Sequence, residues 1–244
     1  MKTKRIALAV IIFLFGLLIS LLPAYSGAQL EAKAEQAAAA FYERHIPPNS
    51  KTPSSDPTED GVLLYPELYK AMKEYNDELY LTHQVGLTDA WAYQAPVLEL
   101  SDYGVDDDVF GTISIPKLSV TLPLYLGASE EHMALGAAQL SQTSFPVSGE
   151  NTNCVIAGHC GFDGADYFRY LCTMEPGDEV LLTTLWGEEH YFVSETEIIA
   201  PDDIDAILIQ PGRELLTLLT CHPYASGGQY RFLVFCERNI INGK

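Results

Sequence analysis

Residues 216–224 read LTLLTCHPY, an apolar run that delivers a cysteine to the end of a strand. The residues from 216 to 220 are apolar or β-branched, which is typical of a buried β-strand. The strand is predicted to end just after Cys221, because Pro223 has no backbone N–H with which to continue a ladder. The thiol of Cys221 is therefore predicted to lie at the rim of a sheet.

A second segment ends in an imidazole. Residues 153–159 read NCVIAGH, which predicts a buried strand that stops near Gly158. His159 then lies where the strand ends and solvent begins. A single histidine in such a place is usually structural, so His159 gains a functional interpretation only together with other groups.

A third segment carries a guanidinium. Residues 229–235 read QYRFLVF, and Arg231 stands at the start of this predicted strand. The preceding loop, 225–228, reads ASGG and is typical of a reversal between two strands. The hairpin is predicted to return Arg231 to the side of Cys221.

The remaining sequence predicts a mainly β domain. Short β-type runs from residue 110 onward are separated by Gly, Pro and Asp, which favours a closed barrel or a sandwich. The predicted strands are 111–115, 120–125, 153–157, 179–185, 190–199, 214–221 and 230–237. Short helices are expected near 130–140 and 166–171. A longer helix is predicted from Pro66, with an apolar stripe of Leu68, Met72, Tyr75 and Leu79 packed on the domain.

The N-terminal region predicts a membrane anchor. Three basic residues in the first five precede an uncharged run over 6–30, which is long enough to cross a bilayer as a helix. The basic flank is expected to stay in the cytoplasm, so the rest of the chain is expected outside. A cleavable signal peptide is the alternative, since 26–28 (SGA) offers small residues. The apolar run, however, exceeds the usual signal-peptide core of about 7–15 residues.

Composition divides the chain into four parts. A chain of 244 residues with 48% hydrophobic content supports one substantial core besides the anchor. Residues 1–30 are the predicted anchor, and 31–64 an alanine-rich helical stalk with a proline-rich linker. Residues 65–109 hold the amphipathic helix and the region before the barrel, and 110–244 hold the β domain.

Charge and cysteine content limit the function classes. Lys and Arg number 14 against 33 Asp and Glu, and a nucleic-acid groove needs clustered positive charge, so nucleic acid is not an expected partner. Five cysteines are an odd number, which leaves at least one thiol over unless chains pair. Two disulfides with one free thiol are one alternative. Cys172 and Cys236 are predicted to be small buried hydrophobes.

The three segments carry groups that together can perform acyl transfer. A cysteine attacks as thiolate, and a nearby cation favours ionisation of a thiol whose ordinary pKa is about 8.5. Cys221 is the predicted nucleophile, and His159 the general acid that protonates a departing amine. Arg231 is predicted to stabilise the oxyanion that develops on the attacked carbonyl. This chemistry needs no cofactor.

Zinc is a weaker interpretation of the same residues. Cys160 follows His159 directly, and His222 follows Cys221, and zinc accepts both thiolate and imidazole ligands. Neighbours on a strand point to opposite faces, so adjacent Cys and His rarely converge on one ion. No metal is therefore expected, and a zinc hydrolase is the alternative that bound metal would reveal.

The three segments resemble those of the sortases, the cysteine transpeptidases of Gram-positive cell surfaces. Residues 217–221 (TLLTC) are similar to the sortase TLxTC signature, and 155–159 (VIAGH) to the segment that bears the sortase histidine. Arg231 lies where these enzymes have arginine on the last strand. The resemblance, which runs from about residue 65 to 238, implies a mainly β fold. That fold is an eight-stranded sortase-type β-barrel with short helices and an N-terminal helical extension.

The resemblance also implies an activity and its partners. Sortases cleave an LPxTG-like sorting signal after its threonine and hold the acyl group on the cysteine until an amine resolves it. By this resemblance Cys221, His159 and Arg231 are catalytic and Thr220 contributes to substrate binding. The implied partners are surface or pilin proteins with the signal, and an amine from a pilin lysine or a cell-wall cross-bridge. The implied location is the cell membrane, with a single span and an extracytoplasmic catalytic domain.

The long region before the barrel resembles the class C sortases, which assemble pili. Their lid carries an Asp-Pro-aromatic motif, and residues 89–91 (DAW) occupy the matching place with alanine instead of proline. Asp89 and Trp91 are the predicted lid residues; an ordinary loop acid and a core aromatic are the alternative. No C-terminal membrane helix of the class C kind precedes Lys244. Housekeeping anchoring to peptidoglycan therefore stays open, as does a noncatalytic surface-binding barrel.

Overall fold

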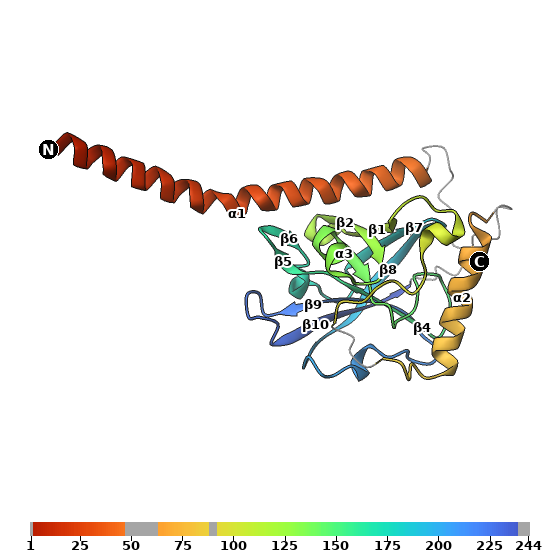
Figure 1. The fold of residues 1–244 in the computed structure, drawn as a ribbon. Coiled ribbons are helices and arrows are strands. Elements are labelled where there is room, and N and C mark those ends of the chain that lie inside the picture. Colours follow the sequence, from red (N-terminus) through yellow and green to blue (C-terminus); the bar gives the residue numbers. More distant parts are fainter. Residues whose placement is uncertain (1, 47–62, 88–91, 239–244) are drawn as a thin grey trace.

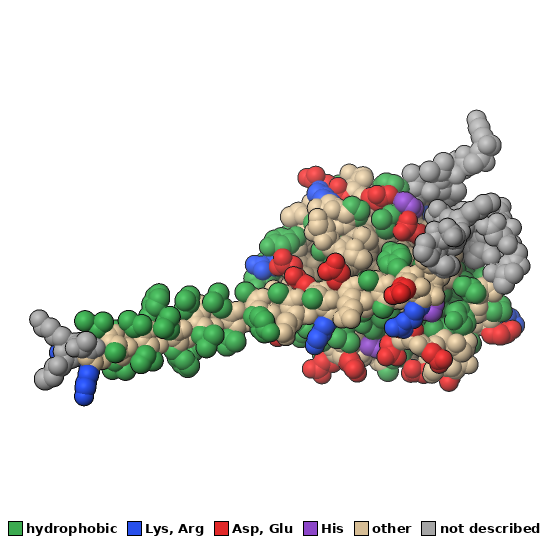
Figure 2. All heavy atoms as spheres, turned by 90° about the horizontal axis from the view of Figure 1, so that it is seen from above, with side chains coloured by type: hydrophobic (Ala, Val, Ile, Leu, Met, Phe, Trp, Pro, Cys, Tyr) green, Lys and Arg blue, Asp and Glu red, His purple; other side chains and the backbone are tan. Residues whose placement is uncertain are grey.

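The computed structural model describes residues 2–46, 63–87 and 92–238 (Figure 1). Its longest element is helix α1 (Lys2–His45), which extends well beyond a β-rich body. Side chains between Ile6 and Tyr25 are largely exposed and apolar, and Figure 2 shows them along the projecting part of the helix. Within the described ranges, α1 is the one helix that is long and apolar enough to cross a membrane.

The second half of α1 packs on the body instead of standing free. Gly27, Ala34, Ala38 and Phe41 are buried, and their spacing of seven, four and three residues places them on one face of the helix. Pro23 lies inside α1, and the ribbon bends along its length (Figure 1). The helix runs unbroken past residue 30, where composition separates the predicted anchor from the predicted stalk.

Eight strands close into a barrel in the order β1-β2-β3-β4-β9-β10-β8-β7. Their bounds are β1 (Val109–Ile115), β2 (Val120–Leu126), β3 (Ala137–Gln139), β4 (Thr152–Ala157), β7 (Glu179–Thr184), β8 (Gly187–Ile199), β9 (Glu214–His222) and β10 (Tyr230–Arg238). Closure pairs the edges that an open sheet would expose. The β2–β3 and β4–β9 contacts are parallel and the others antiparallel. The predicted mainly β fold with an eight-stranded barrel is confirmed.

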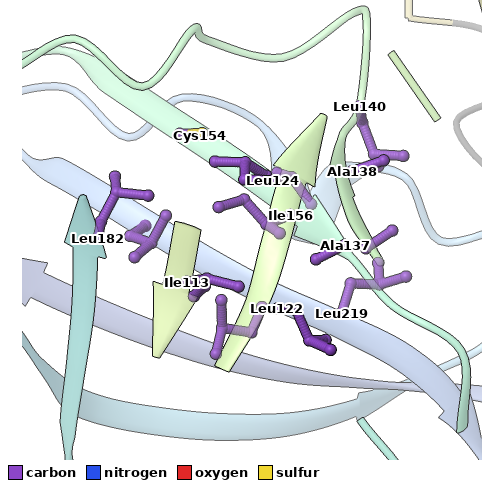
Figure 3. Packing of buried hydrophobic residues seen from close by; sticks show 14 of the residues in the cluster. Ile113, Leu122, Leu124, Ala137, Ala138, Leu140, Cys154, Ile156, Leu182 and Leu219 are labelled. Carbon is purple, nitrogen blue, oxygen red and sulfur yellow. The ribbon is translucent and has the colours of Figure 1, made fainter. Parts of the chain in front are cut away.

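The barrel interior explains the apolar runs of the sequence. Figure 3 shows Ile113, Leu124, Ile156 and Leu182 pointing between the strands, and all four are buried. The interior of β9 is buried without interruption from residue 215 to 220, so this strand lies in the middle of the packed core. Burial of this kind, at roughly 25 cal/mol per Å² of apolar surface, fixes the strand that carries Cys221.

The helix expected near 130–140 is shorter than predicted. Helix α3 (Glu130–Leu135) begins where the Ser129 side chain accepts a hydrogen bond from the His132 backbone N–H. It ends at Gly136, and the chain then enters β3, which pairs with β2. Pairing with a neighbouring strand overrides the helical spacing of this segment.

The helix expected near 166–171 is not formed. The chain instead makes a two-stranded hairpin, β5 (Cys160–Phe162) and β6 (Ala165–Tyr167), followed by the single 3-10 turn η3 (Leu171–Thr173). Gly164 between the two strands has a φ of +92°, a left-handed conformation that glycine adopts without strain. The prediction was wrong because the turn at 163–164 folds residues 165–167 back onto 160–162, where they pair as strands.

Helix α2 (Pro66–Leu81) confirms the predicted amphipathic helix. Leu68 and Met72 are buried, as the apolar stripe requires. Asn76 is buried as well, because its amide bonds both the backbone N–H and the C=O of Phe145. The remaining short 3-10 segments are η1 (Leu100–Tyr103), η2 (Pro116–Leu118) and η4 (Asp205–Ile207).

Candidate active site

Strands β9 and β10 bring a thiol and a guanidinium together. Cys221 and Arg231 are direct partners in the antiparallel register of these strands. Side chains of directly opposed residues lie on the same face of a sheet. The register therefore agrees with the hairpin predicted from the sequence, and the pair lies at the end of the barrel where β9 stops.

Gly228, in the loop between β9 and β10, lies next to Cys221 and Arg231. A Cβ on Gly228 would lie 3.1 Å from Nη1 of Arg231 and 3.5 Å from Sγ of Cys221, so a side chain at this position would contact both groups. Nη1 of Arg231 donates to the backbone oxygens of Gly228 and Tyr230 at 2.8 and 3.2 Å. The loop thus orients one edge of the guanidinium. Sequence reasoning did not assign Gly228 a role, although the paired glycines at 227–228 were a signal for close backbone approach.

Strand β4 carries His159 to the same end of the barrel. It lies parallel to β9, with Ala157 opposite Leu219. The backbone N–H of Gly158 donates to the oxygen of Leu219 at 3.0 Å, which extends the ladder by one residue. His159 follows at once, two positions after Ala157 as Cys221 is two positions after Leu219. The imidazole and the thiol therefore leave adjacent strands at the same level.

Thr220 holds the peptide that precedes His159. Its side chain is buried, and its hydroxyl donates to the backbone oxygen of Gly158 at 2.8 Å. This bond links β9 to the start of the turn that carries the imidazole. Contact between Thr220 and a substrate stays a prediction.

The His159 imidazole is half-buried and stacked. Its ring lies parallel to that of Phe162, with centroids 4.7 Å apart and 10° between the planes. Burial lowers the pKa of His159 below its ordinary 6.5, because the charged form loses hydration. At neutral pH the resting imidazole is therefore mostly uncharged. The sequence carried no signal for Phe162, because the stack depends on the hairpin turning back over the histidine.

The β5–β6 hairpin and the loop after Cys221 meet beside the site. The Tyr224 ring lies 4.1 Å from the guanidinium carbon of Arg169, a cation–π contact. The same ring would lie 2.9 Å from a Cβ on Gly161, so the hairpin and the loop are in direct contact. The segments that follow His159 and Cys221 in the chain are therefore in contact with each other.

The cysteines divide by burial, and all five are free. Cys154 and Cys236 lie in the core, where burial raises the pKa of each thiol. The prediction for Cys236 is confirmed. The prediction for Cys172 is wrong: its side chain is exposed on η3, because the segment that carries it is a surface 3-10 turn and no strand of the barrel.

Two further predictions concern the lid residues and a metal site. Asp89 and Trp91 lie outside the described residues, so their assignment to a lid stays a prediction. Among the residues that are described, no three His, Cys, Asp or Glu side chains gather in a way that could hold a metal ion. The arrangement that remains is a thiol, an imidazole and a guanidinium at one barrel end, which is suited to acyl transfer.

Comparison with known proteins gives the same family from sequence and structure. The sequence matches the sortase domain over residues 113–239. It is 29% identical to sortase D of Bacillus subtilis strain 168 over 130 residues, which cover 52% of this chain and 63% of the relative. It is 28% identical to sortase A of Bacillus anthracis over 173 residues, which cover 66% of this chain and 80% of the relative.

Solved structures agree. The pilus-related sortase C of Group B Streptococcus is 30% identical with a TM-score of 0.63, covering 71% of this chain and 89% of its own. Sortase C-1 of Streptococcus pneumoniae is 28% identical with a TM-score of 0.68, covering 83% and 97%. The matched domain is more than half of the chain and contains all three candidate residues, so this protein belongs to the sortase family of cysteine transpeptidases.

Proposed function

We propose that this protein is an extracytoplasmic transpeptidase that cleaves an LPxTG-like sorting signal after its threonine and joins the acyl group to an amine. One observation carries the proposal. Cys221 and Arg231 are paired in register across β9 and β10, at the end of the barrel where β4 delivers His159. A thiol with a guanidinium and an imidazole is the minimum set for amide attack, oxyanion stabilisation and protonation of the leaving amine.

In the proposed first half-reaction, Sγ of Cys221 attacks the carbonyl carbon of the signal threonine. The carbonyl electrons move to oxygen, where the guanidinium of Arg231 stabilises the new charge. His159, as imidazolium, gives its proton to the glycine nitrogen, and the C–N bond breaks. The products are a thioester on Cys221 and a free glycine amine.

In the second half-reaction an incoming amine attacks the thioester. His159 takes the proton from the attacking nitrogen, and the Cys221 sulfur leaves as thiolate while a new amide forms. Because burial lowers the pKa of His159, only a minor fraction of the imidazole carries the second proton at neutral pH, and that fraction is the proton donor.

The proposed location is the cell membrane, with the catalytic domain outside. Its support is the exposed apolar first half of α1, with basic residues at the N-terminal end of the chain. Sorting signals attached to membrane-bound precursors would meet the barrel at the membrane surface. The proposed partners are therefore proteins that carry such signals and an amine donor at the same surface.

The finer proposal is pilin polymerisation, in which a pilin lysine supplies the amine. Its support is the similarity to a sortase C whose structure is described as pilus-related. The second candidate is anchoring of surface proteins to peptidoglycan through a cross-bridge amine. Its support is that the curated relatives described above are named sortase A and sortase D. The two candidates share the thioester and differ in the nucleophile.

The experiment incubates the full chain in detergent with an LPxTG peptide and either pilin subunits or a cross-bridge amine, followed by mass spectrometry. The wild type is expected to form a Cys221 thioester and joined products, whereas Cys221→Ala forms neither. Cys172→Ala is the matched control, because Cys172 is another free thiol with an exposed side chain. Ladders of pilin identify polymerisation, and single joints to the cross-bridge amine identify anchoring. Joined product at the wild-type rate from Cys221→Ala would end the proposal.

A further inference from the structure

The β5–β6 hairpin connects the imidazole of the site to the membrane helix. At its base, β5 begins directly after His159, and Phe162 stacks on the imidazole at 4.7 Å. The Phe162 ring is in turn parallel to that of Tyr167 on β6, with centroids 6.4 Å apart. The Tyr167 hydroxyl donates to the backbone oxygen of Ala134 at 2.8 Å. The orientation of the imidazole therefore depends on where the hairpin lies.

The tip of the hairpin rests on α1 through backbone contact. A Cβ on Gly27 would lie 2.2 Å from the carbonyl carbon of Gly164 and 2.3 Å from its oxygen, so no side chain fits there. A Cβ on Gly164 would lie 2.0 Å from the backbone oxygen of Pro23. The hydroxyl of Ser26 also donates to the backbone oxygen of Asp163 at 2.9 Å. Only glycine at both positions permits this approach.

A third bond extends the contact along the helix. The backbone N–H of Asp166 on β6 donates to Oε1 of Glu31, one turn after Gly27, at 3.0 Å. The exposed apolar part of α1 ends at Tyr25, within the segment 23–31 that makes these contacts. The hairpin is therefore held by the part of the helix that would leave the bilayer, and the buried face that ends in Phe41 ties the same helix to the barrel.

We propose that α1 is a positioning element for catalysis: its contact with Gly164 fixes the β5–β6 hairpin and, through Phe162, the orientation and water exclusion of the His159 imidazole. The inference rests on the proposed function in so far as His159 is the proton donor. Gly27 and Phe162 are positioning residues, since Gly27 acts only through the hairpin and Phe162 only through the imidazole. A donor displaced by about 1 Å can slow a reaction by up to about 100-fold.

The test compares Gly27→Ala with Gly16→Ala in the full chain in detergent. Both changes replace a glycine of the same helix by alanine, but Gly16 has nothing within 4 Å of its would-be Cβ. Amide hydrogen exchange over 160–167, the pH profile of Cys221 alkylation resolved by mass spectrometry, and kcat and KM for the sorting peptide are measured.

Gly27→Ala is expected to speed amide exchange in the hairpin and to lower kcat about tenfold while KM changes little, because binding groups stay in place. The alkylation profile is expected to move as water reaches His159 and its pKa returns toward 6.5. Gly16→Ala is expected to match the wild type in all three measurements. Should Gly27→Ala not fold, the combined change Ser26→Ala with Glu31→Ala removes both hydrogen bonds without a collision and carries the same test.

Phe162 supplies the second arm. Phe162→Leu removes the stacked ring and is expected to reproduce the loss of kcat, whereas Phe162→Tyr keeps a ring on the imidazole and restores most of it. Combining Gly27→Ala with Phe162→Leu is expected to lower kcat no further than Phe162→Leu alone, because both act along one path. Fully additive losses would contradict that path.

Unchanged exchange and an unchanged alkylation profile in Gly27→Ala would overturn the proposal. So would faster exchange with kcat and the profile unaffected. If the wild type joins no peptide, the proposed function fails, but the exchange and alkylation comparisons still decide the coupling between α1 and His159.

Discussion

Two glycines in the loop after Cys221 are important because they have no side chain. The backbone oxygen of Gly228 accepts from the Arg231 guanidinium, and a Cβ on Gly228 would contact both that group and the thiol. Its φ of +79° is left-handed. Gly227, beside it, has a φ of +71° but open space around its would-be Cβ. Substitutions at the two glycines therefore distinguish the effect of backbone strain from the effect of contact with Cys221 and Arg231.

Gly228→Ala is expected to lower kcat/KM for a sorting peptide by about tenfold or more, because a methyl group displaces Arg231 from the developing oxyanion. Gly227→Ala is the control, with a similar cost in stability of about 1 kcal/mol from the left-handed backbone and little loss of activity. Peptide cleavage and thermal unfolding measure the two effects. Equal loss of activity in both variants would mean that strain, and not contact, explains the result.

Among the elements, strands β8, β9 and β10 are joined by a partly buried group of charged side chains at the barrel end opposite the site. Arg238 on β10 pairs with Glu189 of β8 at 3.2 Å and with Glu214 of β9 at 3.3 Å. The Tyr191 hydroxyl donates to both carboxylates, at 3.0 and 3.4 Å. Burial raises the pKa of Glu214, and Arg238 opposes that rise. Strands β9 and β10, which carry Cys221 and Arg231, are thus joined by an ion pair at their other ends.

Arg238→Met is expected to destabilise the fold by about 3 kcal/mol at pH 7, because two carboxylates remain close together without their cation. Thermal unfolding in detergent measures the loss. In the folded Arg238→Met variant, the pKa of Glu214 is expected to rise further above its ordinary 4.5, because Arg238 no longer opposes the effect of burial. In the unfolded chain Glu214 keeps its ordinary pKa. The folded state then binds protons more readily, so the deficit is expected to shrink as the pH falls from 7 toward 5.

Arg213→Met is the matched control, because Arg213 pairs with Glu237 of β10 at a more exposed position. Exposed ion pairs contribute about 1 kcal/mol or less, and this variant is expected to show a small loss with no recovery at pH 5. A deficit for Arg238→Met that grows on acidification would contradict the assignment of Glu214.

At the scale of the whole molecule, α1 is both the membrane candidate and a part of the folded domain. Phe41 is fully buried between the helix and the barrel, whereas Phe15 is 63% exposed on the same helix. Residues 26–28, whose small side chains also fit a processing site, include Gly27, which contacts Gly164. One helix therefore sets the distance and the orientation of the site relative to its apolar first half.

Phe41→Ala is expected to cost about 3 kcal/mol, the lower end for a buried phenylalanine. That loss corresponds to a fall in Tm of the catalytic domain by about 6–12 °C. Phe15→Ala is the control and is expected to leave that Tm unchanged, because Phe15 makes no buried contact with the barrel. Scanning calorimetry of both variants in the same detergent measures the difference. A Tm for Phe41→Ala equal to that of Phe15→Ala would mean that α1 does not stabilise the domain.

Local patterns were enough for the strands that carry the site. The apolar run before Cys221, the Gly158–His159 strand end and the glycine loop before Arg231 each depend on neighbours within a few residues, and β4, β9 and β10 were predicted from them. The short strands β3, β5 and β6 were not, because three residues carry no periodicity that distinguishes a strand from a turn. The exposed side chain of Cys172 was missed for the same reason.

Residue types and strand patterns are local properties of the chain, so the amino-acid sequence was enough to indicate the class of fold and the candidate chemistry. The hairpin that returns Arg231 to Cys221 is such a local property, whereas the stack of Phe162 on His159 and the contact of Gly27 with Gly164 are seen only in the folded protein. Gly27 and Gly164 are 137 positions apart, and their contact exists only after the barrel has closed and α1 has packed on it. Such contacts depend on the summed geometry of every element between them, which no short stretch of sequence contains.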